Sequence, residues 1–376
     1  MGRGRTREVT RQAISPRVSV LMAVHNGETY LRRAVDSILA QTFADFEFII
    51  VNDGSTDSTA AVLEEYQEQD HRIRVYGQKN RGLLTSLQQG CDLARGEYVA
   101  RMDADDIAFP ERLERQVCFL EQNPGVALVG GAVVVVDETG GPFHTTRYPV
   151  QDRQIKEAIY RYNPFAHPAI IVRKQALLAV GGYRKPFVRA QDYDLWLRLS
   201  ERFELANLPE PVLYYRAHSD QVSIVGFKQQ AVCTLAAQAA ARIRWETGLD
   251  PVSGVEQVTP DVLARLGVGD EIVQKALVEG CLSWANLMVQ TGRADVALPF
   301  LDEASKCFHD VGRDVGAKVH WGYTKLFYKE GQLLRCAISA MKACLVDPSF
   351  PLKLVWRRLR RLFLIAAPSP TASTAP

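Results

Sequence analysis

Apolar runs alternate with helical repeats of apolar residues along the first third of the chain. Segments such as 28–41 and 55–69 repeat apolar residues at helical spacing. Between and around them lie four apolar runs that predict strands: VSVLMAV (18–24), FEFIIV (46–51), RIRVYG (72–77) and EYVARMD (97–103). Strands that alternate with helices of this length predict an α/β fold with a parallel, twisted sheet covered on both sides.

Polar stretches follow three of these four strands. HNGE (25–28) follows the first strand, NDGSTD (52–57) the second, and DADD (103–106) the fourth. Ligands of parallel sheets bind at the carboxyl ends of the strands. The three stretches therefore predict one polar, acid-rich cleft at a single edge of the sheet.

The rest of the chain changes character twice. From about Pro142 to Ser223 the pattern is mixed, and beyond Gly226 it becomes helical and rich in alanine. Two helical segments there, beginning at Gly292 and Gly331, share the spacing of their small residues. They resemble the helix-turn-helix of tetratricopeptide repeats, but their spacing of 39 residues leaves a plain helical bundle equally open.

Composition limits the classes of protein. The length of 376 residues suggests two domains, and a hydrophobic content of 47% is enough for a sizeable core. A net charge of +2 argues against nucleic-acid binding. Seven widely spaced cysteines without a CxxC pair argue against disulfides and zinc, and they favour a reducing, cytoplasmic compartment. The basic start lacks the apolar region of a secretory signal, and the run at 126–136 is too short to span a membrane.

The acidic stretch DADD carries the clearest candidate chemistry. Alternate side chains of a strand point the same way, so Asp103 and Asp105 can face one point. Such oxygen ligands suit Mg²⁺ or Mn²⁺ bridging to phosphates. A calcium-binding EF-hand loop is excluded because Ala108 stands where that loop requires glycine. The alternative is an acidic turn, with Asp106 capping a helix that starts at Pro110.

Several motifs, taken together and in order, resemble family 2 glycosyltransferases. They are the segment 16–59 with its NDGS, then NRGL (80–83), ARGEYVARMDADDIAFPERL (94–113) and AQDYDLWLRL (190–199). The resemblance extends from Arg17 to about Ser223. It implies a GT-A fold, with a mostly parallel twisted sheet flanked by helices. In this chain that fold would be followed by an all-α C-terminal region.

The resemblance also implies roles for five residues near the nucleotide. Asp53 matches the acid that binds the base of a nucleotide-sugar, and His25 stands where the family usually stacks a tyrosine on that base. Glu28 matches an acid near the nucleotide. Asp103 matches the residue that approaches the ribose and the metal, and Asp105 the direct ligand of Mn²⁺ or Mg²⁺. Alternatively, Asp53 forms a turn with its neighbouring glycine, and Glu28 interacts with a helix N-terminus.

Asp192 matches the catalytic general base of the family. Gln191 replaces the glutamate that usually precedes this aspartate, and the loss of a like charge should lower the pKa of Asp192. Asp194 is expected to cap or pack on the helix, and Trp196 and Leu199 to lie in the core. Two histidines, His167 and His218, match positions beside the acceptor, although structural roles are favoured for both.

The implied function is that of an inverting glycosyltransferase. It would move a sugar from a nucleotide-diphosphate sugar, with UDP favoured, to a hydroxyl of a glycan or lipid-linked acceptor in cell-surface polysaccharide synthesis. One alternative is a non-catalytic helical-repeat scaffold with a vestigial transferase domain, whose helices bind a protein partner. Another is a sugar-1-phosphate nucleotidyltransferase, which would need a glycine-rich phosphate loop where this chain has AVHNGETY (23–30).

These patterns divide the chain into four regions. They are a basic flexible tail (1–16), the transferase domain (17–225, with a nucleotide half to about 136 and an acceptor half from 137), a helical region (226–350) and a basic amphipathic helix with a disordered tail (351–376). The last region combines four arginines with Leu354, Trp356 and Phe363. It could lie on the cytoplasmic face of a membrane or pack on the helical region, and these two readings stay open.

Overall fold

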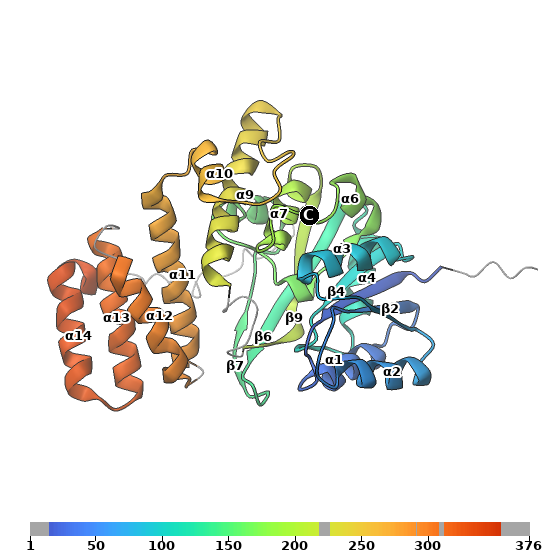
Figure 1. Cartoon of the computed structure of the whole chain (residues 1–376), viewed down its shortest axis with the longest axis horizontal. Coiled ribbons are helices and arrows are strands. Elements are labelled where there is room, and N and C mark those ends of the chain that lie inside the picture. The colour runs from blue at the N-terminus through green and yellow to red at the C-terminus, as the bar shows by residue number, and fades with distance from the viewer. Residues whose placement is uncertain (1–14, 218–225, 291, 308–311, 355–376) are drawn as a thin grey trace, which may run out of the picture. The chain divides into compact units, whose positions relative to one another are not determined.

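The chain forms two compact units in a computed structural model (Figure 1). The structure describes residues 15–217, 226–290, 292–307 and 312–354. The first unit comprises Met1–His218 and Ala236–Thr259, and the second comprises Ser219–Leu235 and Pro260–Pro376. The sequence therefore passes between the units three times, because residues 236–259 return to the first one.

The four strands predicted from the apolar runs are confirmed and pair side by side. They are β1 (Val18–Val24), β2 (Phe46–Asn52), β3 (Ile73–Gly77) and β4 (Tyr98–Met102), all parallel, in the order β3-β2-β1-β4. Because β1 lies between β2 and β4, the polar stretches that follow these three strands meet at neighbouring positions. This is the edge of the sheet at which the sequence predicted a cleft.

The sheet continues beyond β4 with mixed strand directions. The further strands are β5 (Ile107–Ala108), β6 (Val126–Val136), β7 (Pro142–Thr146), β8 (Ile171–Arg173) and β9 (Glu204–Arg216). The full order is β3-β2-β1-β4-β8-β6-β9-β5, and β7 pairs with β6. β8 is antiparallel to both neighbours, so it joins the parallel nucleotide half to the strands of the second half.

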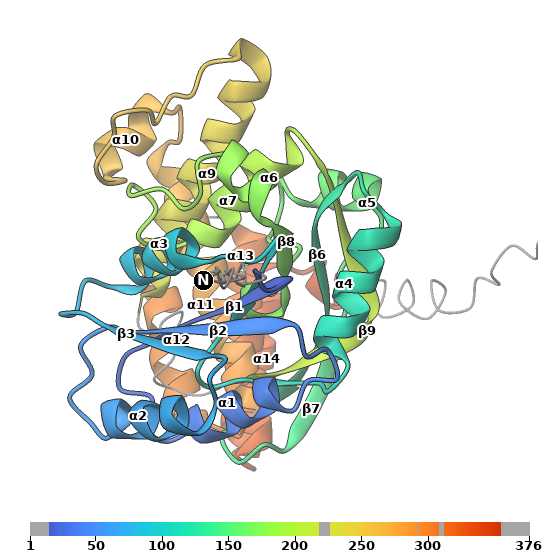
Figure 2. The same ribbon diagram turned by 90° about the vertical axis from the view of Figure 1, so that its right-hand side faces the viewer.

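Helices cover both faces of the parallel strands. The apolar sides of α1 (Leu31–Leu39), α2 (Thr59–Gln69) and α4 (Arg112–Gln122) share one core with β1 and β2. On the opposite face α3 (Leu83–Leu93) packs against β1 (Figure 2). A Cβ at Gly90 would lie 1.9 Å from Leu21 Cδ1, so α3 can approach β1 this closely only with glycine there.

The second half of the first unit is mostly helical around β6 and β9. It contains α5 (Asp152–Ala158), a 3₁₀ turn η1 (His167–Ala169), α6 (Lys174–Ala179) and α7 (Gln191–Ser200). The later part of α9 (Phe227–Thr247) packs here as well, and Gln238 donates a hydrogen bond of 2.9 Å to the Tyr193 hydroxyl. Ion pairs tie Arg244 to Glu201 at the end of α7. Residues 236–259 are thus fastened to the helix that carries Asp192.

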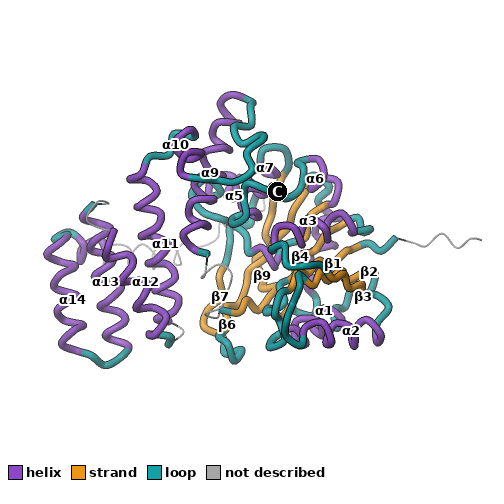
Figure 3. Tube along the Cα trace, in the orientation of Figure 1, coloured by secondary structure: helices purple, strands orange, loops and turns teal. Residues whose placement is uncertain are grey.

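The second unit is built from helices joined by turns wherever it is described (Figure 3). They are α10 (Pro260–Arg265), α11 (Asp270–Gln290), α12 (Ala294–Cys307), α13 (Arg313–Lys329) and α14 (Leu333–Val346), with the start of α9. Within the described ranges, none of the helices is both long and apolar enough to cross a membrane.

Each of the two segments that look alike in sequence forms the turn and the second helix of a helical hairpin. α11 pairs with α12 and α13 with α14, and α13 also packs on both helices of the first hairpin. Gly292 and Gly331, with φ of +77° and +71°, lie in the two turns, where glycine relieves the strain of the left-handed region. The repeated glycine thus marks equivalent turns, as in stacked helical repeats. Most of the region predicted as a basic amphipathic helix, from 355 onward, lies outside the described residues.

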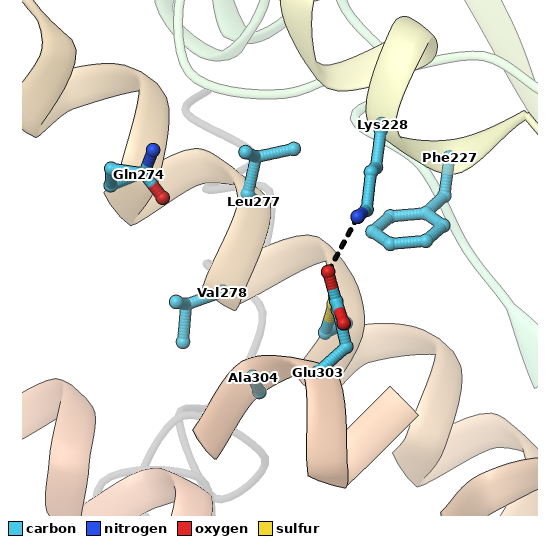
Figure 4. Close-up of a pocket in the computed structure, with 8 residues that line it drawn as sticks. Phe227, Lys228, Gln274, Leu277, Val278, Glu303 and Ala304 are labelled. Atoms are coloured by element: carbon cyan, nitrogen blue, oxygen red, sulfur yellow. Dashed lines mark hydrogen bonds and ion pairs between the residues drawn. The ribbon is translucent and has the colours of Figure 1, made fainter. Parts of the chain in front are cut away.

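A small cavity lies among α9, α11 and α12 of the second unit (Figure 4). Its volume is about 180 Å³, and Phe227, Leu277 and Val278 form much of its lining. At its edge the Lys228 ammonium and the Glu303 carboxylate form an ion pair. That partner, together with Lys306, lowers the pKa of Glu303 to about 2. The charges at this cavity balance each other, so it offers little to attract an ionic ligand.

Candidate functional site

The loops after β1 and β2 are joined by hydrogen bonds. The backbone nitrogen of Asn26 donates to Ser55 Oγ at 2.9 Å, and the Asn26 side chain accepts from the Thr56 nitrogen at 2.8 Å. The Gly27 nitrogen donates to Thr59 Oγ1 at 2.9 Å. Asn26 adopts a left-handed backbone with φ of +53°, which asparagine tolerates better than most residues. The two polar stretches therefore form one preorganised surface.

The Glu28 side chain accepts hydrogen bonds at the N-terminus of α2. Its Oε2 accepts hydrogen bonds from the Ser58 nitrogen at 3.1 Å and the Ser58 hydroxyl at 2.6 Å. α2 begins at the next residue, Thr59, so Glu28 satisfies one of the free N–H groups at that helix end. Glu28 thus interacts with a helix N-terminus, as in the alternative to nucleotide binding. The helix is α2, however, and not α1, which follows Glu28 in sequence. A contact between Glu28 and a nucleotide stays a prediction.

Asp53 is buried and joins the second loop to the NRGL stretch. Its Oδ1 accepts from Gln78 Nε2 at 2.6 Å and from the Arg81 nitrogen at 2.8 Å, and its Oδ2 accepts from the Gly82 nitrogen at 2.8 Å. The next residue, Gly54, has φ of +72°, and a Cβ there would lie 2.6 Å from the Asn80 nitrogen. Asp53 thus joins the loop after β2 to the loop that precedes α3.

His25 is exposed and lies beside Asp53. Its Nδ1 lies 3.0 Å from the Asp53 carbonyl oxygen, and Asn80 Nδ2 lies 3.2 Å from its Nε2. These contacts hold the imidazole at the surface of the loops, where a flat ring can take up a planar ligand. The structure thereby brings His25 and Asp53 together and adds Asn80, which was not among the predicted site residues.

Asp103, Asp105 and Asp106 form a cluster at the end of β4. One carboxylate oxygen from each lies within 4.8 Å of the others. Three carboxylates at this spacing are a donor set for a hard divalent cation. The cluster lies beside the first loop, since a Cβ on Gly27 would be 3.7 Å from the Cβ of Ala104. The polar stretches after β1, β2 and β4 thus meet as predicted.

The expectation that Asp106 caps the following helix is wrong. α4 begins at Arg112 with Glu111 before it, so the helix starts later than predicted. Asp106 is instead 1% exposed, and its Oδ1 accepts from the backbone nitrogen of Arg216 at 2.8 Å. The turn directs this carboxylate inward to β9, 110 residues further along the chain. Its other oxygen, Oδ2, is buried and has no hydrogen-bond partner among the described residues.

Three buried arginines surround the acidic cluster. Arg101 pairs with Asp103 and donates to the Met102 carbonyl. Arg216 donates to the Asp105 carbonyl at 2.8 Å, and its guanidinium lies 4.5 Å from the centre of the Tyr30 ring. Arg112 donates to the Arg101 carbonyl at 2.7 Å, and burial lowers its pKa to about 9. Arg101 thus pairs directly with a carboxylate of the cluster, whereas Arg112 and Arg216 donate to backbone carbonyls beside it.

Burial and mutual repulsion shift the pKa values of these acids. Burial raises the pKa of Asp103, Arg101 opposes the rise, and the charge of Asp105 adds to it. Burial also raises the pKa of Asp106 strongly, with further increases from Asp105 and Asp103. Carboxylates that repel one another in this way gain when a cation arrives. The cluster is therefore chemically suited to a divalent ion.

Asp192 lies at the first turn of α7 and faces the same region. The residue before α7, Ala190, has a left-handed backbone with φ of +55°, a strained conformation for alanine that sets the start of the helix. Asn163 Nδ2 donates to Asp192 Oδ2 at 2.8 Å. Burial raises the pKa of Asp192, the hydrogen bond from Asn163 opposes the rise, and the charge of Asp103 adds to it. The negative charge of Asp103 therefore disfavours the charged form of Asp192.

The other residues singled out in the second half have mainly structural positions. Trp196 and Leu199 are fully buried, which confirms that they belong to the core. Asp194 is buried between Arg184 and Arg198. His218 lies outside the described residues.

His167 is partly buried and hydrogen-bonded. Its Nε2 lies 2.7 Å from the Tyr183 hydroxyl, and burial lowers its pKa well below the usual range. The imidazole is thus neutral near pH 7, as expected of a structural histidine.

Several residues of this region escaped the sequence analysis. Arg101 and Arg216 each lie in a strand that is otherwise largely apolar. A charged residue in such a strand is rarely buried without a partner, so it could have been predicted to lie near the site. Asn163 and Tyr183 lie in loops without a distinctive pattern, and only the fold brings them to Asp192 and His167.

Known proteins resemble both the sequence and the fold. The model of glycosyl transferase family 2 matches residues 19–181. The O-antigen biosynthesis glycosyltransferase WbnJ of Escherichia coli is 35% identical over 224 residues, which cover 58% of this chain and 87% of that protein. The chain belongs to glycosyl transferase family 2.

A further relative and a solved structure agree with this assignment. The amylovoran biosynthesis glycosyltransferase AmsE of Erwinia amylovora is 35% identical over 209 residues, covering 54% of this chain and 78% of that protein. The fold is also that of S. aureus TarS 1–349 in complex with UDP-GlcNAc, with a TM-score of 0.52, 18% identity and coverage of 90% and 92% of the two chains. The predicted GT-A type fold and family 2 membership are thereby confirmed, and the chain is a glycosyltransferase.

Proposed function

We propose that this glycosyltransferase moves a sugar from a nucleotide-diphosphate sugar to a hydroxyl of a glycan or lipid-linked acceptor, with inversion at the anomeric carbon. The observation that carries the proposal is the pairing of two features in one unit. The loops after β1, β2 and β4 form a polar surface with a carboxylate cluster, and the separate carboxylate of Asp192 faces the same region within the field of Asp103.

In the proposed donor site, the nucleotide base lies against His25 and Asp53, with Glu28 beside it and Asp103 near the ribose. UDP is the favoured nucleotide. Asp103 and Asp105 would hold Mn²⁺ or Mg²⁺, which neutralises charge on the departing diphosphate when bound. Arg101, which pairs with Asp103, fixes one of the two proposed ligands in place.

In the proposed reaction, Asp192 takes the proton of the acceptor hydroxyl. The hydroxyl oxygen then bonds to the anomeric carbon while the bond from that carbon to the diphosphate oxygen breaks, and its electron pair leaves with the diphosphate. A base on the opposite face of the sugar from the diphosphate implies in-line attack and inversion. Asn163 holds Asp192 in position for this role.

The biological setting follows from the relatives. WbnJ and AmsE are named for the biosynthesis of O-antigen and amylovoran, respectively, so we assign this chain to polysaccharide biosynthesis. The cysteines of the described residues whose side chains are placed are all free, in keeping with a reducing cytoplasm. The helical second unit is the proposed place for a protein partner.

The decisive experiment is a screen for nucleotide release. The purified chain is incubated with a panel of UDP-, GDP- and other nucleotide-sugars, with Mn²⁺ or Mg²⁺, with and without glycan or lipid-linked acceptors. We expect one donor to release its nucleotide in a metal-dependent reaction. Asp192→Asn should keep nucleotide binding and lose transfer by about a hundredfold or more. Full transfer by this variant would contradict the role of Asp192, and no release from any donor would favour a scaffold.

A further inference from the structure

Helix α14 of the second unit carries an apolar stripe that the described residues leave exposed. Leu334, Ile338, Met341 and Leu345 of α14 are spaced by four, three and four residues, so they lie on one face of the helix. Their exposed fractions range from 40% to 76%. The opposite face, with Ser339 and Ala343, is buried. Large apolar residues grouped on a surface in this way mark a contact with another molecule or a membrane.

The charges around this stripe have one sign. α14 carries Arg335 and Lys342 and no acidic residue, and both side chains are exposed. From 313 to 354 the sequence has seven Lys and Arg against three Asp and Glu, whereas from 270 to 307 it has three against six. Two of those three acids, Asp314 and Asp347, are paired with lysines. The positive charge thus concentrates in the hairpin that carries the stripe.

The sequence after α14 is also apolar and positively charged. Leu352 and Lys353 are exposed just after Phe350, which packs on Trp321 of α13 with ring centres 6.1 Å apart. The following residues, 355–376, contain four arginines and no acid in their sequence. An apolar stripe flanked by cations without acids matches a surface that is both anionic and able to accept apolar side chains.

We propose that the α14 face, defined by Leu334, Ile338, Met341 and Leu345 with Arg335 and Lys342, docks on an anionic phospholipid bilayer. The apolar side chains enter the boundary between head groups and acyl chains, and the two cations contact lipid phosphates. A second copy of this chain would present the same positive charge and would be repelled at this face. This surface belongs to the second unit, and the proposal does not depend on the sugar-transfer reaction.

The test is co-sedimentation of the full chain with vesicles of phosphatidylcholine mixed with phosphatidylglycerol, compared with phosphatidylcholine alone. We expect binding to the anionic vesicles that weakens as salt is added. The triple variant Ile338→Gln, Met341→Gln, Leu345→Gln should bind about tenfold more weakly or worse. Arg335→Gln with Lys342→Gln should weaken binding to anionic vesicles only. A matched control, Trp245→Gln with Leu249→Gln, removes exposed apolar residues from the first unit and should bind normally.

Hydrogen exchange of the full chain separates this face from the arginine-rich end. Peptides from 333–346 should gain protection when anionic vesicles are added, while circular dichroism shows that the variants keep their helices. The proposal is overturned if the wild-type chain ignores anionic vesicles, or if α14 gains no protection while the chain binds. It is also overturned if the free chain forms a dimer that the triple variant dissolves, because a second copy would then cover the stripe.

Discussion

Asn163 donates a hydrogen bond of 2.8 Å to the Asp192 carboxylate, across 29 residues of sequence. This bond stabilises the charged form of a carboxylate whose pKa burial raises. A general base must be deprotonated to act, so activity should fall as the pH drops through the raised pKa of Asp192. The acid limb of kcat/KM should therefore lie above the value near 3.9 of an ordinary aspartate.

Replacing Asn163 tests this relationship. Asn163→Ala removes a contact that lowers the pKa, so the acid limb of the kcat/KM profile should move to higher pH. A shift of about one pH unit is expected, because a hydrogen bond to a charged group contributes roughly 1.5 kcal/mol. Asn286→Ala, in the second unit, is the control and should leave the profile in place. A lower kcat at every pH with an unmoved limb would mean that Asn163 does not act through the pKa of Asp192.

Removal of the metal should separate activity from stability. Because buried arginines hold the turn of the acidic cluster through an ion pair and backbone hydrogen bonds, chelation should abolish transfer but leave the melting temperature almost unchanged. Asp105→Asn should reduce metal-dependent transfer by about a hundredfold or more, since charge stabilisation by a cation is worth several kcal/mol. Glu64→Gln on α2 is an exposed control. A large drop in melting temperature on chelation would instead indicate a structural cation.

Asp106 should matter for stability through β9. Asp106→Ala leaves the Arg216 N–H without its acceptor and should lower the free energy of unfolding by about 1–3 kcal/mol. Asp106→Asn keeps an acceptor oxygen. Burial raises the pKa of Asp106, so its charged form costs stability above the pKa of the unfolded chain, and the neutral amide should fold as well or better at neutral pH. Loss of metal-dependent transfer in Asp106→Asn, equal to that in Asp105→Asn, would make Asp106 a ligand.

Asp53 should couple nucleotide affinity to the order of the NRGL loop. Both its oxygens accept hydrogen bonds from N–H groups. In Asp53→Asn an NH₂ group replaces one of these oxygens, so two hydrogen-bond donors would face each other. We expect weaker nucleotide binding by about tenfold, with a loss of stability of about 1–3 kcal/mol. Isothermal titration with UDP and thermal unfolding measure the two effects. The exposed Asp45→Asn is the control. Lower stability with unchanged affinity would reduce Asp53 to a turn former.

The sequence by itself determined the four parallel strands of the nucleotide half. β1 and β2 are continuous apolar runs because both of their faces are covered, and this makes such strands readable from periodicity alone. The cleft followed as well, because the carboxyl ends of parallel strands share one edge. The repeated glycines of the helical region marked two turns, since only a left-handed backbone position favours glycine so strongly.

Only the tertiary structure decided the partners of the site residues. Asp106 was expected to cap a helix, and local pattern cannot show that its carboxylate reaches β9 instead. The buried arginines, the bond from Asn163 to Asp192 and the exposed stripe of α14 depend on which faces of distant segments meet. The periodicity of a sequence shows which residues share the apolar or the polar face of one helix or strand. Which element covers that face is set by packing between segments far apart in sequence. This packing placed the carboxylates beside buried arginines, and among the described residues it left the apolar stripe of α14 exposed.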